Sequence, residues 1–208
     1  MNKLAVLGAS GHGKVVADTA LCCGWDMVEF FDDAWPSRLV NGSWPIVGDS
    51  QALQDRLGDY QGVIVAIGNN AVRHAKLKDL LVSHAPVVSL VHPRAEVSRF
   101  ASIGVGSVVF AGAVVNVDVK TGVGAILNTG CSVDHDCVLA DAVHISPGAR
   151  LAGTVSVGEK SWIGIGASVR QMINVGCQVV VGAGAAVVND VPDNVVVVGV
   201  PARVVSGS

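Results

Sequence analysis

The chain has 208 residues, of which 50% are hydrophobic and 15% are charged, and its formal net charge is −3. This length suits one large domain or two small ones, and the apolar content excludes a disordered chain. The mild acidity argues against nucleic acid as a partner, because no basic stripe is present to neutralise phosphates. The longest apolar run, Val179 to Val188, is too short and too rich in Gly and Ala to cross a membrane.

Cysteine usage and the first residues bear on the compartment. Five cysteines, an odd number, favour reduced thiols over a disulfide framework. The apolar run that follows Lys3 is very short and ends in a Gly-rich loop, which is unlike a signal peptide. We therefore expect a soluble protein of the cytoplasm.

Residues 1–88 alternate short apolar runs with helical patterns. The apolar runs predict buried parallel strands at residues 4–7, 28–31, 62–67 and 87–91. The helical patterns cover residues 14–23, 50–57 and 71–82, with Ser50 as the candidate N-cap of the second helix. Alternation of strands and helices predicts a Rossmann-like α/β domain, a small parallel sheet with helices on its faces.

Residues 89–208 repeat with a period of six. Every sixth residue from Val91 to Val187 is Val, Ile or Leu at sixteen of seventeen positions, and the exception is Thr121. A second series, four residues further on, is mostly small and includes Cys131 and Cys137. Hexapeptide periodicity is the mark of a parallel β-helix, in which both series point inward. The second half is therefore predicted to be an all-β solenoid.

The period also sets the size of the solenoid. Seventeen hexads at three per coil make between five and six coils, but the pattern does not reveal their handedness. The register fails at Asp193, so residues 192–205 are expected to leave the solenoid as a tail.

A Gly-rich loop, Gly8–Gly13, follows the first predicted strand and opens a helix. Its glycines let the backbone approach a pyrophosphate, and the helix N-terminus adds N–H groups and a partial positive charge. The GxxGxG spacing differs from the dinucleotide fingerprint, so a nicotinamide cofactor does not follow. Asp32, Asp33 and the segment Ala66–Asn70 end two further strands at the same carboxyl edge, where open sheets bind ligands. The sequence favours a nucleotide site, and the alternative is a tight turn with two solvated acids.

In the solenoid, His135 lies between Asp134 and Asp136, next to the inward position of Cys137. The imidazole must therefore face outward, where a carboxylate can orient it and stabilise its charged form, as a general base requires. The alternative is an exposed polar corner. A zinc site that combines the histidines with the cysteines fails on direction, because the cysteines fall on inward positions.

Several outward positions of the solenoid are apolar or small, which a monomer would leave in contact with water. They are Val105, Val108, Val114, Val117, Ala142 and Ile165. Three-fold closure around parallel solenoid axes would bury one face of each subunit, so we expect a homotrimer.

Together these features resemble the bacillosamine-type amino-sugar N-acetyltransferases, within the broader group of sialic-acid O-acetyltransferase-like proteins. The local sequences that carry the resemblance are Gly8–Gly13, Phe31–Asp33, Ala66–Asn70, Asp134–Cys137 and Gly199–Arg203. The resemblance covers nearly the whole chain, in order. It implies a homotrimer of left-handed β-helices, with acetyl-CoA in a groove between neighbouring coils and the active sites between subunits.

The resemblance also implies site residues. A UDP-linked 4-amino sugar would bind the N-terminal domain through Ser10, Gly11, His12, Asp32, Asp33, Ile67 and Gly68. Acetyl-CoA would contact Asn128, His144, Gly153, Ile165 and Gly182, with no metal involved.

His135 matches the family's general base, and Asp136 stands where the best-known members have a Glu that orients it. Because Asp136 is shorter by one methylene, Asp134 is the alternative partner. His144 matches a residue near the thioester carbonyl, where Gly153 offers a backbone N–H for the oxyanion. A free amine is largely protonated at pH 7, so a base that takes its proton as the C–N bond forms assists the reaction.

The sequence leaves other functions open. The enzyme alternatives are O-acetylation of a sugar, or N-acetylation of a GDP- or dTDP-linked amino sugar. A zinc-dependent hydratase on the same solenoid needs three outward histidines, and the solenoid offers His135 and His144, with His92 far away at its start. The remaining alternative is a protein that binds a nucleotide sugar without catalysis.

Overall fold

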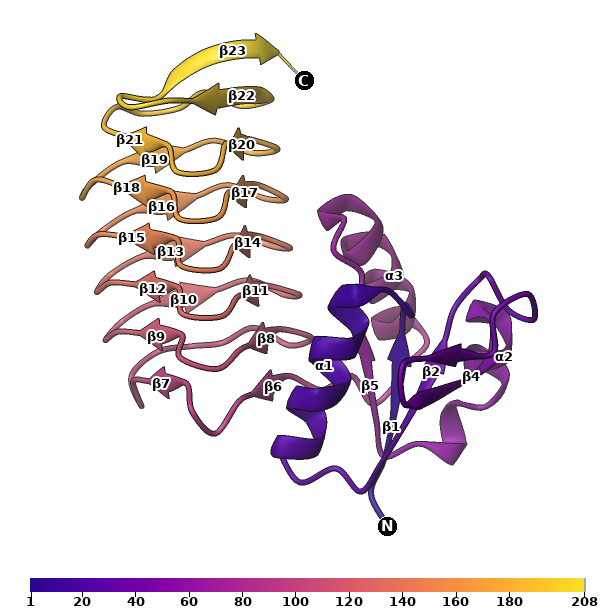
Figure 1. The fold of residues 1–208 in the computed structure, drawn as a ribbon. Coiled ribbons are helices and arrows are strands. Elements are labelled where there is room, and N and C mark those ends of the chain that lie inside the picture. The colour runs from indigo at the N-terminus through magenta and orange to yellow at the C-terminus, as the bar shows by residue number, and fades with distance from the viewer. Residues whose placement is uncertain (208) are drawn as a thin grey trace. The chain divides into compact units, whose positions relative to one another are not determined.

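The computed structural model describes residues 1–207 and divides the chain into two compact units, Met1–Pro93 and Arg94–Ser208 (Figure 1). The sequence periodicity predicts a boundary after residue 88. In the structure the second unit starts at Arg94, and Val91, the first residue of the hexad series, is 40% exposed. Among the described residues, no helix is both long and apolar enough to cross a membrane.

The first unit contains a five-stranded sheet in the order β3-β4-β2-β1-β5. Its strands are β1 (Lys3–Leu7), β2 (Met27–Phe31), β3 (Val40–Asn41), β4 (Trp44–Gly48) and β5 (Gly62–Val65). The central strands β2, β1 and β5 run parallel and have almost entirely buried side chains, as continuous apolar runs predict. The sequence patterns miss β3 and β4, whose hairpin extends the sheet at one edge.

Three α-helices pack on this sheet, α1 (Gly11–Cys22), α2 (Ser50–Asp55) and α3 (Asn70–Val82), and a 3-10 helix covers Leu57–Asp59. Each α-helix begins after a side-chain cap: Ser10, Asp49 and Asn69 accept a hydrogen bond from a first-turn N–H. The expectation that Ser50 caps α2 is wrong. Asp49 Oδ1 accepts from the N–H of Ala52 at 2.8 Å, so Ser50 is the first helical residue.

The predicted strand at residues 87–91 is only partly formed. Val87 pairs with Val63 in an isolated parallel bridge, and β6 is limited to Leu90–Val91.

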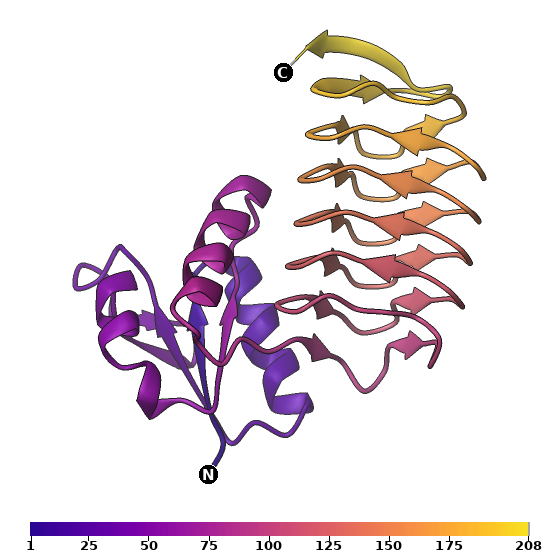
Figure 2. The ribbon, with the colours of Figure 1, turned by 180° about the vertical axis from the view of Figure 1, so that it is seen from behind.

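The second unit is a left-handed parallel β-helix, whose short strands stack coil upon coil (Figure 2). One sheet contains β7 (Glu96–Val97), β9 (Val114–Val115), β12 (Ser132–Val133), β15 (Arg150–Leu151), β18 (Ser168–Val169) and β21 (Ala186–Val187). A second contains β10 (Lys120–Thr121), β13 (Val138–Leu139), β16 (Ser156–Val157) and β19 (Asn174–Val175). The third includes β8 (Val108–Val109), β11 (Ile126–Leu127), β14 (His144–Ile145), β17 (Trp162–Ile163), β20 (Val180–Val181), β22 (Val195–Val198) and β23 (Arg203–Gly207).

The core of the solenoid consists of the two inward series that the hexad period predicts. From Val109 onward the aliphatic series is buried at every step, and Thr121, its polar member, is buried too. The small series lies beside it, with Cys131 and Cys137 fully buried. Burial raises the pKa of the Cys131 thiol to about 12, so this thiol stays protonated near neutral pH.

Two outward expectations are wrong. Val108 and Ala142 are buried within the single chain. Val105, Val114, Val117 and Ile165 are exposed as expected. Val108 is covered because its strand β8 lies in the sheet next to β11, where the neighbouring residue Ile126 is buried as well.

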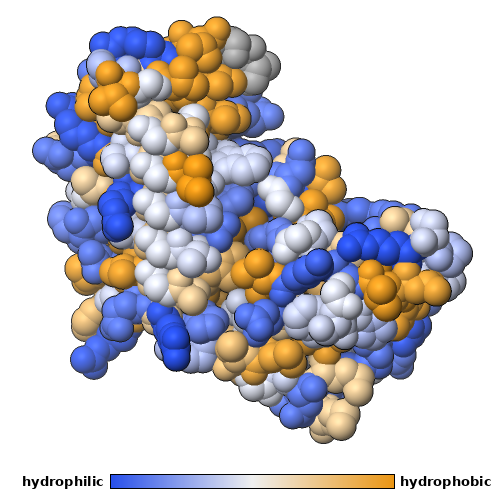
Figure 3. Space-filling view, viewed as in Figure 1, coloured by the Kyte–Doolittle hydropathy of each residue, from blue (hydrophilic) through white to orange (hydrophobic). Residues whose placement is uncertain are grey.

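The expected departing tail is also only partly correct. After the period fails, β22 still pairs in parallel with β20, and the chain then turns back so that β23 pairs antiparallel with β22. This hairpin ends the solenoid and exposes apolar side chains, including Val200 and Val204. Figure 3 shows the resulting apolar surface in orange at the C-terminal end of the solenoid.

Candidate functional site

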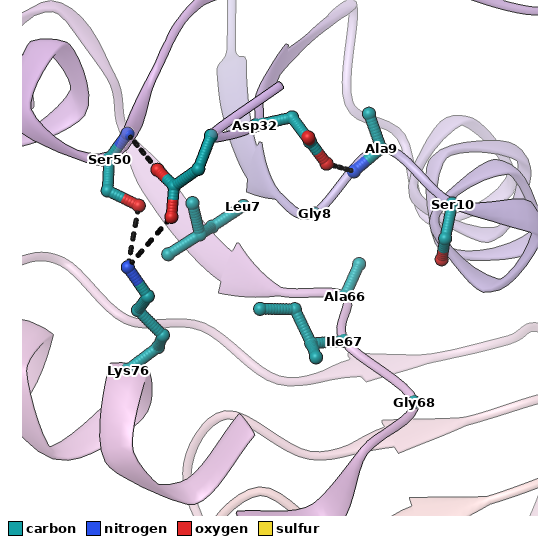
Figure 4. A pocket seen from close by; sticks show the side chains of 11 residues that line it. Leu7, Gly8, Ala9, Ser10, Asp32, Ser50, Ala66, Ile67, Gly68 and Lys76 are labelled. Carbon is teal, nitrogen blue, oxygen red and sulfur yellow. Dashed lines mark hydrogen bonds and ion pairs between the residues drawn. The ribbon is translucent and has the colours of Figure 1, made fainter. Parts of the chain in front are cut away.

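A cavity of about 310 Å³ opens at the carboxyl edge of the sheet in the first unit (Figure 4). It is lined by residues that end β1, β2 and β5, by the first residue of α2 and by one side chain of α3. The lining residues are Leu7, Gly8, Ala9, Ser10, Asp32, Asp33, Ser50, Ala66, Ile67, Gly68 and Lys76. Five of the seven residues expected to hold a nucleotide are therefore in one cavity: Ser10, Asp32, Asp33, Ile67 and Gly68.

Gly8 brings the Gly-rich loop close to the end of β5. Its φ of +110° is a conformation that favours glycine, and a Cβ at this position would lie 2.8 Å from Ile67 Cγ1 and 2.9 Å from the Ala66 carbonyl oxygen. A side chain at residue 8 would therefore push the two cavity walls apart.

Asp32 secures the same loop. Its Oδ2 accepts a hydrogen bond from the N–H of Ala9 at 2.7 Å, and its Oδ1 accepts from the N–H of Ala34 at 2.9 Å. Asp32 is one of the residues expected to bind the nucleotide sugar. The contacts within the chain also give Asp32 a structural role, because each of its carboxylate oxygens accepts a hydrogen bond from a backbone N–H.

Arg38 and Asn41, which the sequence patterns do not single out, hold the loop from its other side. Arg38 Nη1 donates to the carbonyl of Ala9 at 2.6 Å, and Asn41 Nδ2 donates to the carbonyl of Ser10 at 3.1 Å. The two side chains are joined by a 2.8 Å hydrogen bond from Arg38 Nη2 to Asn41 Oδ1. The N–H groups at the start of α1 are thereby fixed in direction.

Asp33 belongs to a network on the cavity wall. Its Oδ1 accepts from the N–H of Ser50 at 2.9 Å, and its Oδ2 lies 3.2 Å from Lys76 Nζ, which also donates to Ser50 Oγ at 2.8 Å. Hydrogen bonds from Ser50 and then from Lys76 hold the pKa of Asp33 below its ordinary value. Ser50 and Lys76 are thus site residues that sequence reasoning missed.

Gly11 and His12, also expected to hold the nucleotide, belong to the first turn of α1 and are not among the lining residues of this cavity. Burial, reinforced by the charge of Arg73, lowers the pKa of His12 to about 4, so its ring is neutral at pH 7.

Arg73 is itself 1% exposed and organises the wall of the cavity. Its Nη1 donates to the carbonyls of Ile67 and Gly68 at 3.0 and 3.2 Å, and its Nη2 donates to Asn70 Oδ1 at 2.8 Å. Burial lowers the pKa of this guanidinium to about 10, so it stays charged at pH 7.

His135 lies at an exposed corner of the solenoid, between β12 and β13. Its Nδ1 is 2.7 Å from Asp136 Oδ2, and this hydrogen bond is the main reason why the pKa of His135 is raised. Asp134 has other partners: its Oδ1 accepts from the backbone N–H of His135 and from the side-chain Nδ2 of Asn116, both at 2.8 Å. Asp136 has a φ of 60°, a left-handed conformation that Asp tolerates.

Gly153 lies one coil further on, directly against the imidazole of His135. A Cβ at residue 153 would be 2.5 Å from Cε1 and 2.6 Å from Nε2 of that ring. The backbones are tied together as well, because the N–H of Thr154 donates to the carbonyl of His135 at 2.9 Å. His135, Asp136 and Gly153 thus form one group, in which Nε2 is the ring nitrogen that Asp136 leaves available.

A second cavity, of about 460 Å³, runs along the sheet that contains β14, β17 and β20. It is lined by Asn128, His144, Ser146, Pro147, Trp162, Gly164, Ile165, Val180, Val181, Gly182 and Ala183. Four residues expected to contact acetyl-CoA are in this group: Asn128, His144, Ile165 and Gly182. Gly153 and His135 are not, so within the described single chain the predicted base and the predicted coenzyme groove are separate features.

His144 is 6% exposed and is held between two side chains. Its ring stacks on Trp162, with centroids 4.9 Å apart and an interplanar angle of 16°, and its Nε2 is 3.1 Å from Asn128 Nδ2. Asn128 Oδ1 accepts from the N–H of Thr129 at 2.8 Å, which assigns Nδ2 as the donor toward His144. In the neutral ring the proton is then on Nδ1, and Asn128 is the donor of this pair.

Trp162 is one of the lining residues of this cavity that sequence reasoning missed. Its Nε1 donates to Ser146 Oγ at 2.6 Å, and the indole is partly exposed. A signal was available, because Trp162 occupies in the next coil the position that His144 occupies in its own, and the two residues pair directly between β14 and β17. Lys76 has no comparable sequence signal. It lies on helix α3, where no repeat relates it to Asp33.

Among the described residues, no group of three or more His, Cys, Asp or Glu side chains is placed to hold a metal ion.

Comparison with known proteins adds independent information. A family model described as the PglD N-terminal domain matches residues 3–80. The chain is 37% identical over 120 residues to the UDP-N-acetylbacillosamine N-acetyltransferase of Bacillus subtilis (strain 168). This match covers 53% of the chain and 52% of that protein, so it spans about half the length of this curated relative.

Several solved structures resemble nearly the whole chain. The acetyltransferase domain of PglB from Neisseria gonorrhoeae FA1090, in complex with acetyl coenzyme A, is 42% identical with a TM-score of 0.94, and the match covers 99% of this chain and 100% of that one. PerB from Caulobacter crescentus, in complex with CoA and GDP-perosamine, is 38% identical with a TM-score of 0.92, and the match covers 99% and 98% of the two chains.

Proposed function

Because this chain belongs to the bacillosamine-type family of acetyl-CoA-dependent sugar N-acetyltransferases, we propose that it transfers the acetyl group of acetyl-CoA to the 4-amino group of a UDP-linked amino-dideoxy sugar. The observation that carries this proposal is the group formed by His135, Asp136 and Gly153. In this group the carboxylate of Asp136 orients the imidazole of His135, and the ring packs against the Cα of Gly153. One relative is named for UDP-N-acetylbacillosamine and the PerB structure contains GDP-perosamine, so the choice of UDP is part of the proposal.

His135 serves as the general base. With Nδ1 donating to Asp136, its Nε2 accepts the proton of the sugar amine as the nitrogen attacks the thioester carbonyl. The C–S bond then breaks, and the proton is passed to the departing thiolate of coenzyme A. The product is an amide, and no acyl-enzyme is formed. Cys131 and Cys137 are buried protonated thiols, and their inward position supports this direct route.

The tetrahedral intermediate needs fixed donors for its oxyanion. We assign this task to the backbone N–H of Gly153 in one subunit and to the pair formed by Asn128 and His144 in its neighbour, because the two groups are separate within one chain. Since Asn128 donates one amide hydrogen to His144 Nε2, its second amide hydrogen is directed by the same contact. Ile165 and Gly182 line the groove that we propose for acetyl-CoA.

The nucleotide sugar is proposed to bind in the cavity of the first unit. The start of α1, capped by Ser10, provides backbone N–H groups and a partial positive charge for the diphosphate, and Gly11 and His12 contribute N–H groups of that first turn. Asp32, Asp33, Ile67 and Gly68 line the remainder of the cavity.

The active assembly is proposed to be a homotrimer. The supporting observation is that Val105, Val117 and Ile165 are exposed apolar side chains on the solenoid, which a three-fold contact would cover. The separation of His135 from the cavity of His144 in one chain also favours a site shared between subunits.

The compartment is proposed to be the cytoplasm. All five cysteines are free thiols in the structure, which suits a reducing environment.

The proposal is tested by incubating the protein with acetyl-CoA and UDP-, GDP- and dTDP-linked 4-amino sugars, and by following thiol release. We expect thiol release with the UDP-linked amine and a product with one acetyl group on nitrogen by NMR. Acetylation of a hydroxyl would favour the O-acetyltransferase alternative. Tight binding of the nucleotide sugar without thiol release would favour the non-catalytic alternative.

A further inference from the structure

The cavity of the first unit has two chemically different ends. Figure 4 shows Ser10 on one side and the Ser50–Lys76 pair on the other, with Asp32 between them. The Ser10 end offers the N-terminus of α1. The far end offers the ammonium of Lys76, which donates to the hydroxyl of Ser50 and to the carboxylate of Asp33, and this carboxylate also accepts from the backbone N–H of Ser50.

These ends set the direction of a bound nucleotide, and this step rests on the proposed function. The N-terminus of a twelve-residue helix favours the diphosphate, because its N–H groups and dipole attract negative charge. The base then extends away from Ser10. Leu7 and Ile67 supply apolar surface along that path, and Ser50 and Lys76 stand where it ends.

We propose that Lys76 and Asp33 read the nucleobase of the nucleotide sugar and select uracil. Lys76 is a hydrogen-bond donor and Asp33 an acceptor, held side by side at 3.2 Å. Uracil carries an N3–H between two carbonyls, so whichever carbonyl meets Lys76, the adjacent N3–H meets Asp33. Cytosine has a lone pair at N3, which the carboxylate repels.

The hydrogen bonds that Asp33 already accepts should favour binding of uracil over guanine. Guanine presents a carbonyl, a ring N–H and an amino group, and therefore needs two acceptors beside one donor. Each oxygen of Asp33 already accepts one hydrogen bond, Oδ1 from the N–H of Ser50 and Oδ2 from Lys76. Guanine, with two N–H donors, would compete with both of these contacts, whereas the single N3–H of uracil competes with one of them. The expected order of affinity is UDP, then GDP, then CDP and ADP.

The side chains are fixed well enough to discriminate. Lys76 has two partners, Asp33 and Ser50, and its side chain is only 30% exposed. Hydrogen bonds to both Asp33 oxygens keep this carboxyl ionised at neutral pH, because they lower its pKa.

The test is calorimetric titration of the full chain with UDP, GDP, CDP and ADP in the absence of acetyl-CoA. UDP should bind at least about tenfold more tightly than CDP, which is the value of one hydrogen bond to a charged group. Lys76→Met should reduce the ratio of UDP to CDP affinity toward one. Lys78→Met is the matched control, because it removes the same charge from the exposed side of α3 and should leave the ratio unchanged.

A second variant tests the acceptor. In Asp33→Asn the amide oxygen can still accept from Ser50 while the amide nitrogen becomes a donor toward the base. The preference should shift toward CDP, whose N3 accepts a hydrogen bond. Circular dichroism and melting temperature verify that both variants are folded.

Three results would overturn base reading. They are equal affinity of the wild type for UDP and CDP, tighter binding of GDP than UDP, and a uniform loss for all four nucleotides in Lys76→Met, which would place Lys76 on the diphosphate. Absence of binding by every nucleotide would overturn the proposed nucleotide-sugar function as well. Equal UDP and CDP affinity with acetyl transfer intact would overturn base reading alone.

Discussion

The Cα of Gly153 faces the imidazole of His135 so closely that a Cβ would lie 2.5 Å from Cε1 of the ring. This contact joins two consecutive coils of the solenoid, because the N–H of Thr154 also donates to the carbonyl of His135. The imidazole thus packs against the backbone of Gly153 and is hydrogen-bonded to Asp136. Its orientation is a property of the fold.

Gly153→Ala should therefore displace the imidazole without unfolding the protein, because the ring is exposed and can rotate away. We expect kcat to fall by about 10- to 100-fold, since a misplaced base loses most of its contribution. The melting temperature should change little. Steady-state kinetics with thermal denaturation checks both, and full activity in the folded variant would show that the contact does not position His135.

Asp136→Asn should change the pH profile. The carboxylate raises the pKa of His135, and the base acts only when it is unprotonated, so kcat/KM of the wild type should rise with pH through an inflection above the ordinary His value of about 6.5. Removing the negative charge should move that inflection to lower pH. The measurement is kcat/KM between pH 5 and 9.

Asp134→Asn is the matched comparison, because Asp134 contacts the backbone N–H of His135 and lies outside the pair formed with Nδ1. Its inflection should move less than that of Asp136→Asn. A larger movement of the inflection in Asp134→Asn would show that Asp134, and not Asp136, orients His135.

Trp162→Ala should uncover His144, since the stacked indole covers one face of the imidazole at 4.9 Å. We expect the KM for acetyl-CoA to rise by about tenfold, the effect of losing one aromatic contact, while the KM for the nucleotide sugar is unchanged. Trp162→Phe keeps an aromatic face but loses the hydrogen bond to Ser146. Its KM for acetyl-CoA should lie between those of the wild type and Trp162→Ala. A rise confined to the nucleotide sugar would contradict the assignment of this groove.

Arg73→Gln should loosen the wall of the nucleotide cavity. The carbonyls of Ile67 and Gly68 and the amide of Asn70 lose their buried donor, at a cost of about 1–3 kcal/mol in the free energy of unfolding. UDP affinity should fall, and acetyl-CoA affinity should stay the same. Urea unfolding and calorimetry separate the two effects, and unaltered stability would show that these contacts are dispensable.

Hexad periodicity predicts the solenoid because each aliphatic step, such as Val133 and Ile163, meets the same requirement, an inward side chain in a narrow core. It predicts the outward direction of His135 for the same reason. It does not predict that Val108 and Ala142 are buried, because their cover comes from neighbouring strands and corners.

The local sequence around the first cavity predicts its glycine loop and its acids but not their partners. Asp32 and Asp33 follow a recognisable strand, whereas Lys76 and Arg38 reach the site from elements distant in sequence. The N-cap of α2 could not be predicted for the same reason: it depends on a partner that is distant in sequence. Asp49 and Ser50 are both good capping residues, and the choice between them depends on Ser50 donating its N–H to Asp33.

The central claim is that His135 removes the proton of the attacking amine, and the most direct measurement is kcat of His135→Ala in acetyl transfer from acetyl-CoA to a UDP-linked 4-amino sugar. His84→Ala is the control, because His84 is an exposed histidine of the first unit outside both cavities. We predict a fall of about 10²- to 10⁴-fold in His135→Ala with the dissociation constant of acetyl-CoA unchanged, because a base acts in the transition state. Turnover equal to that of the wild type at pH 7 would contradict the mechanism.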